Sequence, residues 1–257
     1  MNTSTSPRRL RVWHYLVIVA VYIAIVQATG IFLTAGQDVE YAQPTSVDYL
    51  IRSYVIPVGL GILFAIGITG YLGRWQEIFV EGRRFRRWTL VVPAIVLVCA
   101  LIITNYSGLG EKGIVFALLL FISTMMVGFG EELVFRGIGV SAFRDGGFSE
   151  FKVGLWTTVI FGLAHGTNIF VAGPQALVQV VATTATGFVF YLVLRSTGAL
   201  VIAMAAHGLW DFSVISTQVN PDSPSPLANI AGVALAVVLL IAVLARKRLN
   251  PAGAKSA

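Results

Sequence analysis

The sequence predicts an all-α membrane protein with about eight transmembrane helices. Hydrophobic residues make up 56% of the 257 residues, charged residues make up 12%, and the mean hydropathy is +0.82. A soluble domain has about 25% charged residues, so this composition is typical of a chain that lies mostly within a bilayer. Apolar runs of the length that a helix needs to cross a bilayer, about 17–25 residues, fill most of the chain and leave no room for a separate soluble domain.

Eight apolar runs account for the predicted helices. They are Val12–Ala35, Leu50–Leu72, Trp88–Thr104, Gly113–Val140, Val153–Phe170, Pro174–Leu194, Ala199–Thr217 and Leu227–Ala245. The first run is longer than the core of a signal peptide, so we expect it to be retained as a helix. We divide the chain into residues 1–112 with three helices, residues 113–217 with the next four, and residues 218–257 with the last helix and a tail.

The placement of the basic residues predicts the orientation. If the N-terminus is cytoplasmic, 16 of the 18 lysines and arginines fall at cytoplasmic positions, and only Arg52 and Lys112 fall outside. Cytoplasmic loops carry such an excess in membrane proteins. We therefore expect a multi-pass protein of the cell membrane with both termini cytoplasmic. The net charge of +6 follows from the basic residues at these cytoplasmic positions and does not indicate a nucleic-acid partner. The expected partner is therefore the lipid bilayer, and no nucleic acid is expected.

The stretch Gly130-Glu131-Glu132-Leu133-Val134-Phe135-Arg136 is the first candidate site. Charged side chains at membrane depth are costly and usually mark function. Glu132 and Arg136 are four residues apart on one helix face and can pair, while Glu131 points about 100° away. One carboxylate is thus held by the arginine and the other is left to act. The alternative is a charge cluster where a helix leaves the membrane.

Two further motifs place histidines within predicted spans. Phe161 and His165 share a helix face, as do His207 and Asp211. At about 1.5 Å per residue, Glu131, His165 and His207 would lie about 13, 18 and 12 Å from the cytoplasmic ends of their helices. Similar depths allow three helices to bring these side chains to one cavity. The alternative is that each histidine only makes a structural hydrogen bond between helices.

Such a site can activate water in two ways. A carboxylate and a histidine can deprotonate a water while a second histidine stabilises an oxyanion. Two histidines and a glutamate are also a known zinc ligand set, although the usual helical zinc motif is absent. The only cysteine, Cys99, permits neither an intrachain disulfide nor a cysteine-rich zinc site.

The motifs Glu131-Glu132-x-x-x-Arg136, Phe161-x-x-x-His165 and His207-x-x-x-Asp211 together resemble those of the CAAX prenyl protease type II and bacteriocin-processing family. This family of intramembrane proteases is also called CPBP or Abi. The resemblance covers about Gly113 to Thr217. It implies an endopeptidase of eight helices whose site opens toward the cytoplasm and whose substrate is a membrane-associated or lipidated peptide.

The resemblance also implies the roles of the residues. Glu131 would be the base that activates water, with His165 assisting. His207 and Asp211 would stabilise the oxyanion, and Glu132, Arg136 and Phe161 would support them. Asp211 stands where members commonly have asparagine, and an ionised carboxylate cannot donate a hydrogen bond. The resemblance favours hydrolysis without a cofactor, and zinc is the alternative.

Two other functions are compatible with the sequence. The chain could bind a partner as an immunity or scaffold protein of the same fold without catalysis. It could also be a proton-coupled transporter, because glutamate and histidine within a membrane can relay protons. The halves of the sequence show no repeat that would support a transporter.

Overall fold

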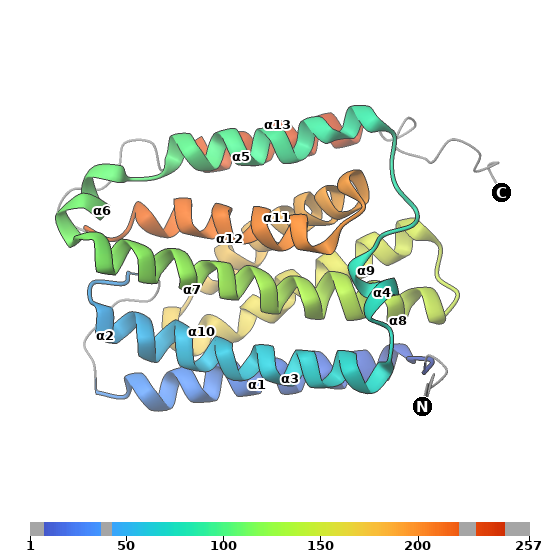
Figure 1. The fold of residues 1–257 in the computed structure, drawn as a ribbon, viewed down its shortest axis with the longest axis horizontal. Helices are drawn as coiled ribbons and strands as arrows, with labels where there is room; N and C mark the ends of the chain where they lie inside the picture. Colours follow the sequence, from blue (N-terminus) through green and yellow to red (C-terminus); the bar gives the residue numbers. More distant parts are fainter. Residues whose placement is uncertain (1–7, 37–42, 221–229, 245–257) are drawn as a thin grey trace, which may run out of the picture.

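The computed structural model describes residues 8–36, 43–220 and 230–244. The described chain is helical and contains no strand, apart from one isolated bridge between Val80 and Ala199. The all-α prediction is therefore confirmed. The helices run side by side as one bundle, with α1 and α3 along one side and α5 and α13 along the other (Figure 1).

The first side of the bundle is built from two long helical segments. They are α1 (Val12–Thr34) and the continuous segment of α2 (Val47–Leu50), the π-helix η1 (Ile51–Val55) and α3 (Ile56–Leu72). The two segments pack closely because Gly61 of α3 has no side chain. A Cβ at Gly61 would lie 2.8 Å from the ring of Tyr22.

The centre of the bundle is one continuous helical segment that packs against α12 (Leu200–Ser216). The segment consists of α7 (Ile114–Glu132), the π-helix η3 (Leu133–Ile138) and α8 (Gly139–Asp145). A Cβ at Gly128 would lie 2.6 Å from the backbone nitrogen of Gly208 in α12. Small residues at such a crossing let helix backbones approach closely, which is the usual way that helices associate in a membrane.

The remaining helices enclose this centre. They are α4 (Trp75–Phe79), the 3-10 helix η2 (Arg87–Leu90), α5 (Val91–Ile103), α6 (Tyr106–Lys112), α9 (Glu150–Ala164), the 3-10 helix η4 (His165–Asn168), α10 (Ile169–Ala172), α11 (Gln175–Thr197) and α13 (Ile230–Leu244). Gly198 ends α11 in the left-handed region with φ of 78°, a conformation that glycine adopts without strain. The chain can therefore turn sharply into α12.

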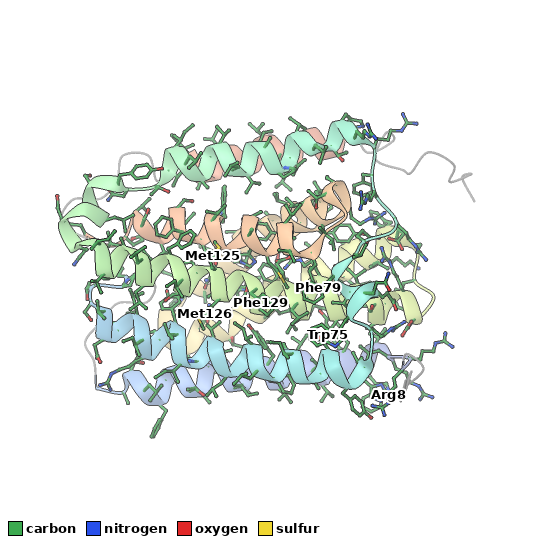
Figure 2. All side chains as sticks on the ribbon, viewed as in Figure 1. Arg8, Trp75, Phe79, Met125, Met126 and Phe129 are labelled. Carbon is green, nitrogen blue, oxygen red and sulfur yellow. The ribbon has the colours of Figure 1, made fainter. Side chains whose placement is uncertain are left out.

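The outer surface of the bundle suits a bilayer. Among the described residues, five helical segments are long and apolar enough to cross a membrane, and there are six if the pair Arg87–Ile103 and Tyr106–Lys112, which bends by 55°, is one span. Large apolar side chains project outward along the bundle (Figure 2), and Phe32 and Phe170 are 79% and 84% exposed. The protein is thus a multi-pass membrane protein, as predicted.

The predicted number of eight spans is not confirmed. The seventh run forms α12, which is shorter than the helices that could cross a membrane, and the described part of the eighth run forms the short apolar helix α13. The seventh run is short because the chain is extended at Ala199, where it pairs with Val80, so that the helix begins at Leu200. The predicted loop Asn220–Pro226 and the basic tail with Arg246, Lys247, Arg248 and Lys255 lie outside the described residues, except for Asn220.

The two ends of the bundle differ in charge. We call the end where α1 begins and where α4 and α8 lie the basic end, and the end where α2 and α6 lie the distal end (Figure 1). Arg8 and Trp75 mark the basic end in Figure 2. Within the described chain, Arg52 and Lys112 lie at the distal end, Arg136 lies inside the bundle, and the other lysines and arginines lie at the basic end.

Candidate active site

The site begins where α7 passes into η3. Glu131 and Glu132 form the last turn of α7, and the π-helix follows directly. Single π-helical turns within α-helices are rare and are often found at functional sites. Glu132 is fully buried, whereas the side chain of Glu131 is 20% exposed and lines a cavity. The two adjacent glutamates thus face different surroundings, as predicted.

Glu132 and Arg136 form the buried ion pair that the helix periodicity predicts. Arg136 Nη1 donates to Glu132 Oε1 at 2.7 Å, and neither side chain is exposed. Arg136 Nη2 donates to the backbone oxygen of Gly187 in α11 at 2.7 Å, and its guanidinium lies 4.1 Å from the centre of the Phe161 ring. The pair therefore connects the central helix to α9 and α11.

Gly187 is needed for this arrangement. A Cβ at this position would lie 2.7 Å from the Phe161 ring and 2.9 Å from Arg136 Nη2. The predicted supporting role of Phe161 has a structural counterpart, because its ring contacts both Arg136 and the two histidines. The Phe161 ring centre lies 4.8 Å from that of His165 and 5.7 Å from that of His207.

The structure brings Glu131, His165 and His207 together. Glu131 Oε2 lies 4.0 Å from His165 Nε2 and 3.8 Å from His207 Nε2. These separations are too long for direct hydrogen bonds, and Glu131 Oε2 has no hydrogen-bond partner among the described residues. Polar atoms separated by slightly more than 3.5 Å are the usual setting for a bridging water. The convergence predicted from the sequence is therefore present.

The hydrogen bonds fix which ring nitrogen of each histidine faces Glu131. His165 Nδ1 lies 2.9 Å from the backbone oxygen of Phe161, which can only accept, so we assign the proton to Nδ1. His207 Nδ1 lies 2.9 Å from Glu132 Oε1, and an ionised carboxylate is also only an acceptor. Both Nε2 atoms are thereby directed toward Glu131.

The ring of His207 is positioned by contacts with Glu132, Phe190 and Asp211. Its ring stacks on Phe190 with centres 4.3 Å apart and planes inclined by 17°. Asp211 Oδ2 lies 3.4 Å from His207 Nε2. Asp211 is thus adjacent to His207 as its spacing in the sequence predicts, and its position next to Nε2 suits the orientation of that ring.

A cavity of about 430 Å³ connects these groups to the distal end of the bundle. Glu131, His165, His207 and Asp211 all line it. The depth of Glu131 differs from the prediction, because η3 and α8 extend the helix to Asp145. At about 1.5 Å per residue, Glu131 lies about 21 Å from that end, near the middle of the bundle.

Three amide side chains form a row along the cavity. Gln27 Nε2 donates to Asn168 Oδ1 at 2.5 Å, and Asn168 Nδ2 donates to Gln179 Oε1 at 2.8 Å. These residues come from α1, η4 and α11 and all line the cavity. We call them the amide row. Sequence analysis missed them, and the only signal was that amides are uncommon within apolar runs.

Tyr22 of α1 was also missed. It lines the cavity beside Glu131, and a Cβ at Gly130 would lie 2.7 Å from the Tyr22 hydroxyl. The first helix therefore forms a wall of the site and does not merely anchor the chain. No motif in the first run indicates this, since it follows from how α1 packs.

The three side chains that meet in the cavity are also possible metal donors. Two imidazole nitrogens and a carboxylate are ligands that zinc accepts. In the described part of the chain, no three His, Cys, Asp or Glu side chains have an arrangement that would hold a metal ion as they stand. The separations around Glu131 Oε2 are of a size that a single water would bridge.

Fold and site together define a class, the multi-pass all-α membrane proteins with a glutamate–histidine site inside the bundle. Residues 113–213 match the family described as type II CAAX prenyl endopeptidase Rce1-like. The chain therefore carries an Rce1-like domain, and the resemblance inferred from the motifs is confirmed. At the level of the family, the match supports a membrane-embedded peptidase. No curated protein matches the chain.

Proposed function

We propose that this protein is an intramembrane endopeptidase that hydrolyses a peptide bond with a water activated by Glu131. One observation carries the proposal: inside the cavity, Glu131 Oε2 lies 4.0 Å from His165 Nε2 and 3.8 Å from His207 Nε2, separations that a single water can bridge. A base must lie within direct reach, or one water, of the proton that it removes. The Rce1-like domain supports a peptidase with a peptide substrate.

The proposed reaction has two steps. Glu131 takes a proton from water, His165 helps to orient it, and the water oxygen attacks the carbonyl carbon of the scissile bond. The negative charge that develops on the carbonyl oxygen is stabilised by His207, which in its doubly protonated form presents an Nε2–H and is balanced by Glu132 and Asp211. The proton then passes from Glu131 to the leaving amine as the C–N bond breaks.

The remaining residues are positioning residues in this proposal. Glu132 accepts hydrogen bonds from both Arg136 and His207, so it couples the orientation of the oxyanion-stabilising ring to a buried ion pair. Asp211 orients His207 and does not itself donate to the oxyanion, because an ionised carboxylate has no proton to give. The proposed location is the cell membrane, with the basic end cytoplasmic.

The substitution Glu131→Gln tests the proposal because it keeps the size of the side chain and removes the base. Protein termini from membranes and medium would be compared between cells with the wild type and cells with Glu131→Gln at equal expression. New termini should occur with the wild type and be lost with the variant. The matched control is Glu111→Gln, an exposed glutamate outside the cavity, which should keep the wild-type termini.

The same comparison separates the alternatives. Identical termini in all samples, with each protein folded and expressed, would favour a non-catalytic immunity or scaffold protein. Addition of a chelator to purified membranes should leave cleavage unchanged. Loss of cleavage that zinc restores would instead favour the zinc-dependent mechanism, for which Glu131, His165 and His207 would be the ligands.

A further inference from the structure

The cavity divides the bundle into a hollow half and a packed half. On α1 the lining residues begin at Tyr22 and continue to Thr34 at the distal end, and on α12 they run from His207 to Ile215. On the central helix, Phe135 is the lining residue nearest the basic end, and its buried ring forms the floor. Almost the whole cavity therefore lies on the distal side of Glu131.

The half toward the basic end is closed by packing. Every residue of the central helix from Glu132 to Phe143 is buried, as is every residue from Val189 to Ser196 in α11. The distal part of α11 differs, since residues 177–186 are all partly or fully exposed. As far as the described residues show, a peptide therefore has no path to Glu131 through the basic half.

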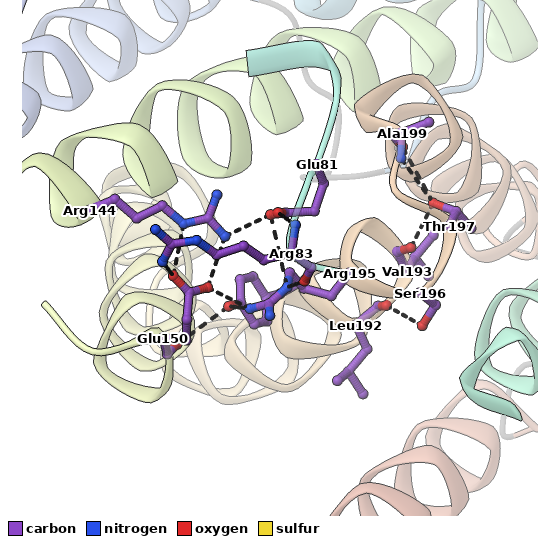
Figure 3. A network of polar contacts seen from close by, with 11 residues as sticks. Glu81, Arg83, Arg144, Glu150, Leu192, Val193, Arg195, Ser196, Thr197 and Ala199 are labelled. Atoms are coloured by element: carbon purple, nitrogen blue, oxygen red, sulfur yellow. Dashed lines mark hydrogen bonds and ion pairs between the residues drawn. The ribbon is translucent and has the colours of Figure 1, made fainter. Parts of the chain in front are cut away.

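Ion pairs seal the basic end further (Figure 3). Arg144 Nη2 pairs with Glu81 Oε2 and with Glu150 Oε2, both at 2.8 Å. Arg195 Nη1 pairs with Glu150 Oε2 at 2.8 Å, and its side chain is 1% exposed. Arg83 also pairs with Glu150. These contacts join the segment after α4, the start of α9 and the end of α11 at the basic end.

The amide row indicates what the open half accommodates. It lies between α1, η4 and α11 in the hollow half, and its members alternate donors and acceptors along their hydrogen bonds. An amide side chain offers both a carbonyl oxygen and an NH₂ group, the same groups that an extended peptide backbone needs as partners. Hydrogen bonds within the row can therefore be exchanged for hydrogen bonds to a peptide.

We infer that the substrate reaches Glu131 from the distal end, as an extended peptide segment whose backbone lies along the amide row. The basic end faces the cytoplasm under the positive-inside rule, so the substrate is a membrane-anchored or exported peptide presented from the non-cytoplasmic side. The nature of the substrate rests on the proposed function, whereas the direction of access rests on the cavity and on the positive-inside rule. The direction is opposite to the cytoplasmic opening that the family resemblance implies.

Thiol labelling tests the direction of access without any cleavage. Cys99→Ala removes the only cysteine and gives a background for single cysteines. Ala164→Cys places a thiol in the cavity beside His165, and Ser149→Cys places one on the exposed surface of the basic end. A positively charged, membrane-impermeant methanethiosulfonate would be added to right-side-out and to inverted membrane vesicles, and labelling would be measured as a mass shift.

The two cysteines should show opposite patterns. Ala164→Cys should be labelled in right-side-out vesicles and lose labelling in inverted ones, while Ser149→Cys should be labelled only in inverted vesicles. Labelling of Ala164→Cys only in inverted vesicles would overturn the inference. So would absence of labelling from both sides when the denatured protein is labelled, because the cavity would then be closed to solutes. Neither result depends on whether the protein cleaves peptides.

Discussion

At the scale of single residues, the two adjacent glutamates differ because the helix turns between them. Glu132 Oε1 accepts hydrogen bonds from Arg136 and His207, whereas Glu131 Oε2 has no such partner within the described residues. The first arrangement holds a charge in place and the second leaves a carboxylate that can bind a proton. Position on the helix thus gives Glu132 a structural role and suits Glu131 to the proposed chemistry.

This difference predicts that Glu132→Gln destabilises the protein, whereas Glu131→Gln does not. Glu132→Gln would leave Arg136 buried without an opposite charge, and breaking a buried ion pair costs about 3–5 kcal/mol. The free energy of unfolding in detergent should fall by this amount. Glu111→Gln is the control and should be unchanged. A wild-type stability for Glu132→Gln would show that the pair does not hold the helices together.

At the scale of the helices, the crossing of α7 and α12 positions the site. His207 of α12 reaches Glu132 of α7 because Gly128 and Gly208 let the two backbones meet. The Met125 side chain, labelled on α7 in Figure 2, lies at this crossing, where a Cβ at Gly208 would contact it. Any side chain larger than hydrogen at Gly128 would push the two helices apart.

We expect Gly128→Ala to separate the helices and reduce both stability and cleavage. Its Cβ would contact the backbone oxygen of Met204 and the backbone nitrogen of Gly208, neither of which can rotate away. Gly67→Ala in α3 is the matched control, because a Cβ there would have no atom within 4 Å. Thermal unfolding and cleavage would be measured for both, and equal behaviour of the two variants would contradict the role given to the crossing.

The sequence predicted those parts of the site that depend on helix periodicity. Glu132 and Arg136 are four residues apart, and so are His207 and Asp211. In both cases the structure shows the two side chains in contact. The sequence did not predict η3, because a π-helical turn is decided by the packing around it. It also did not predict the hydrogen bond between Glu132 and His207, which are 75 residues apart. Such contacts depend on which helices cross, and apolar runs alone do not specify that.

At the scale of the whole molecule, the ion pairs at the basic end hold segments that are far apart in the sequence. Arg195 Nε donates to the backbone oxygen of Arg83 at 2.7 Å, and Arg195 Nη1 pairs with Glu150 at 2.8 Å. Glu81, whose side chain is 2% exposed, lies 3.9 Å from Arg195 Nε. One arginine of α11 therefore contacts two other segments of the chain, the one after α4 and the start of α9.

Arg195→Met should lower the thermal unfolding temperature clearly, because it removes the charge from this cluster while keeping an unbranched apolar side chain. Loss of one partner from a buried pair costs about 3–5 kcal/mol. Arg52→Met is the control, since its pair with Asp48 is exposed and such pairs contribute about 1 kcal/mol or less. If both variants unfolded at the same temperature, the cluster would be no more important than a surface pair.

The unequal packing of the two halves has a mechanical consequence. Local opening of a folded protein requires least free energy where few apolar groups are buried. The distal half, with its hollow and the exposed stretch of α11, is therefore the compliant part of the molecule, and the basic half is the rigid part. Under the proposed direction of access, an entering chain would push α1 away from residues 177–186 of α11, while the part of α11 that contacts Arg136 and His207 stays packed. In the proposed mode of access, the packed half thus holds the charged residues in place while the open half yields to the substrate.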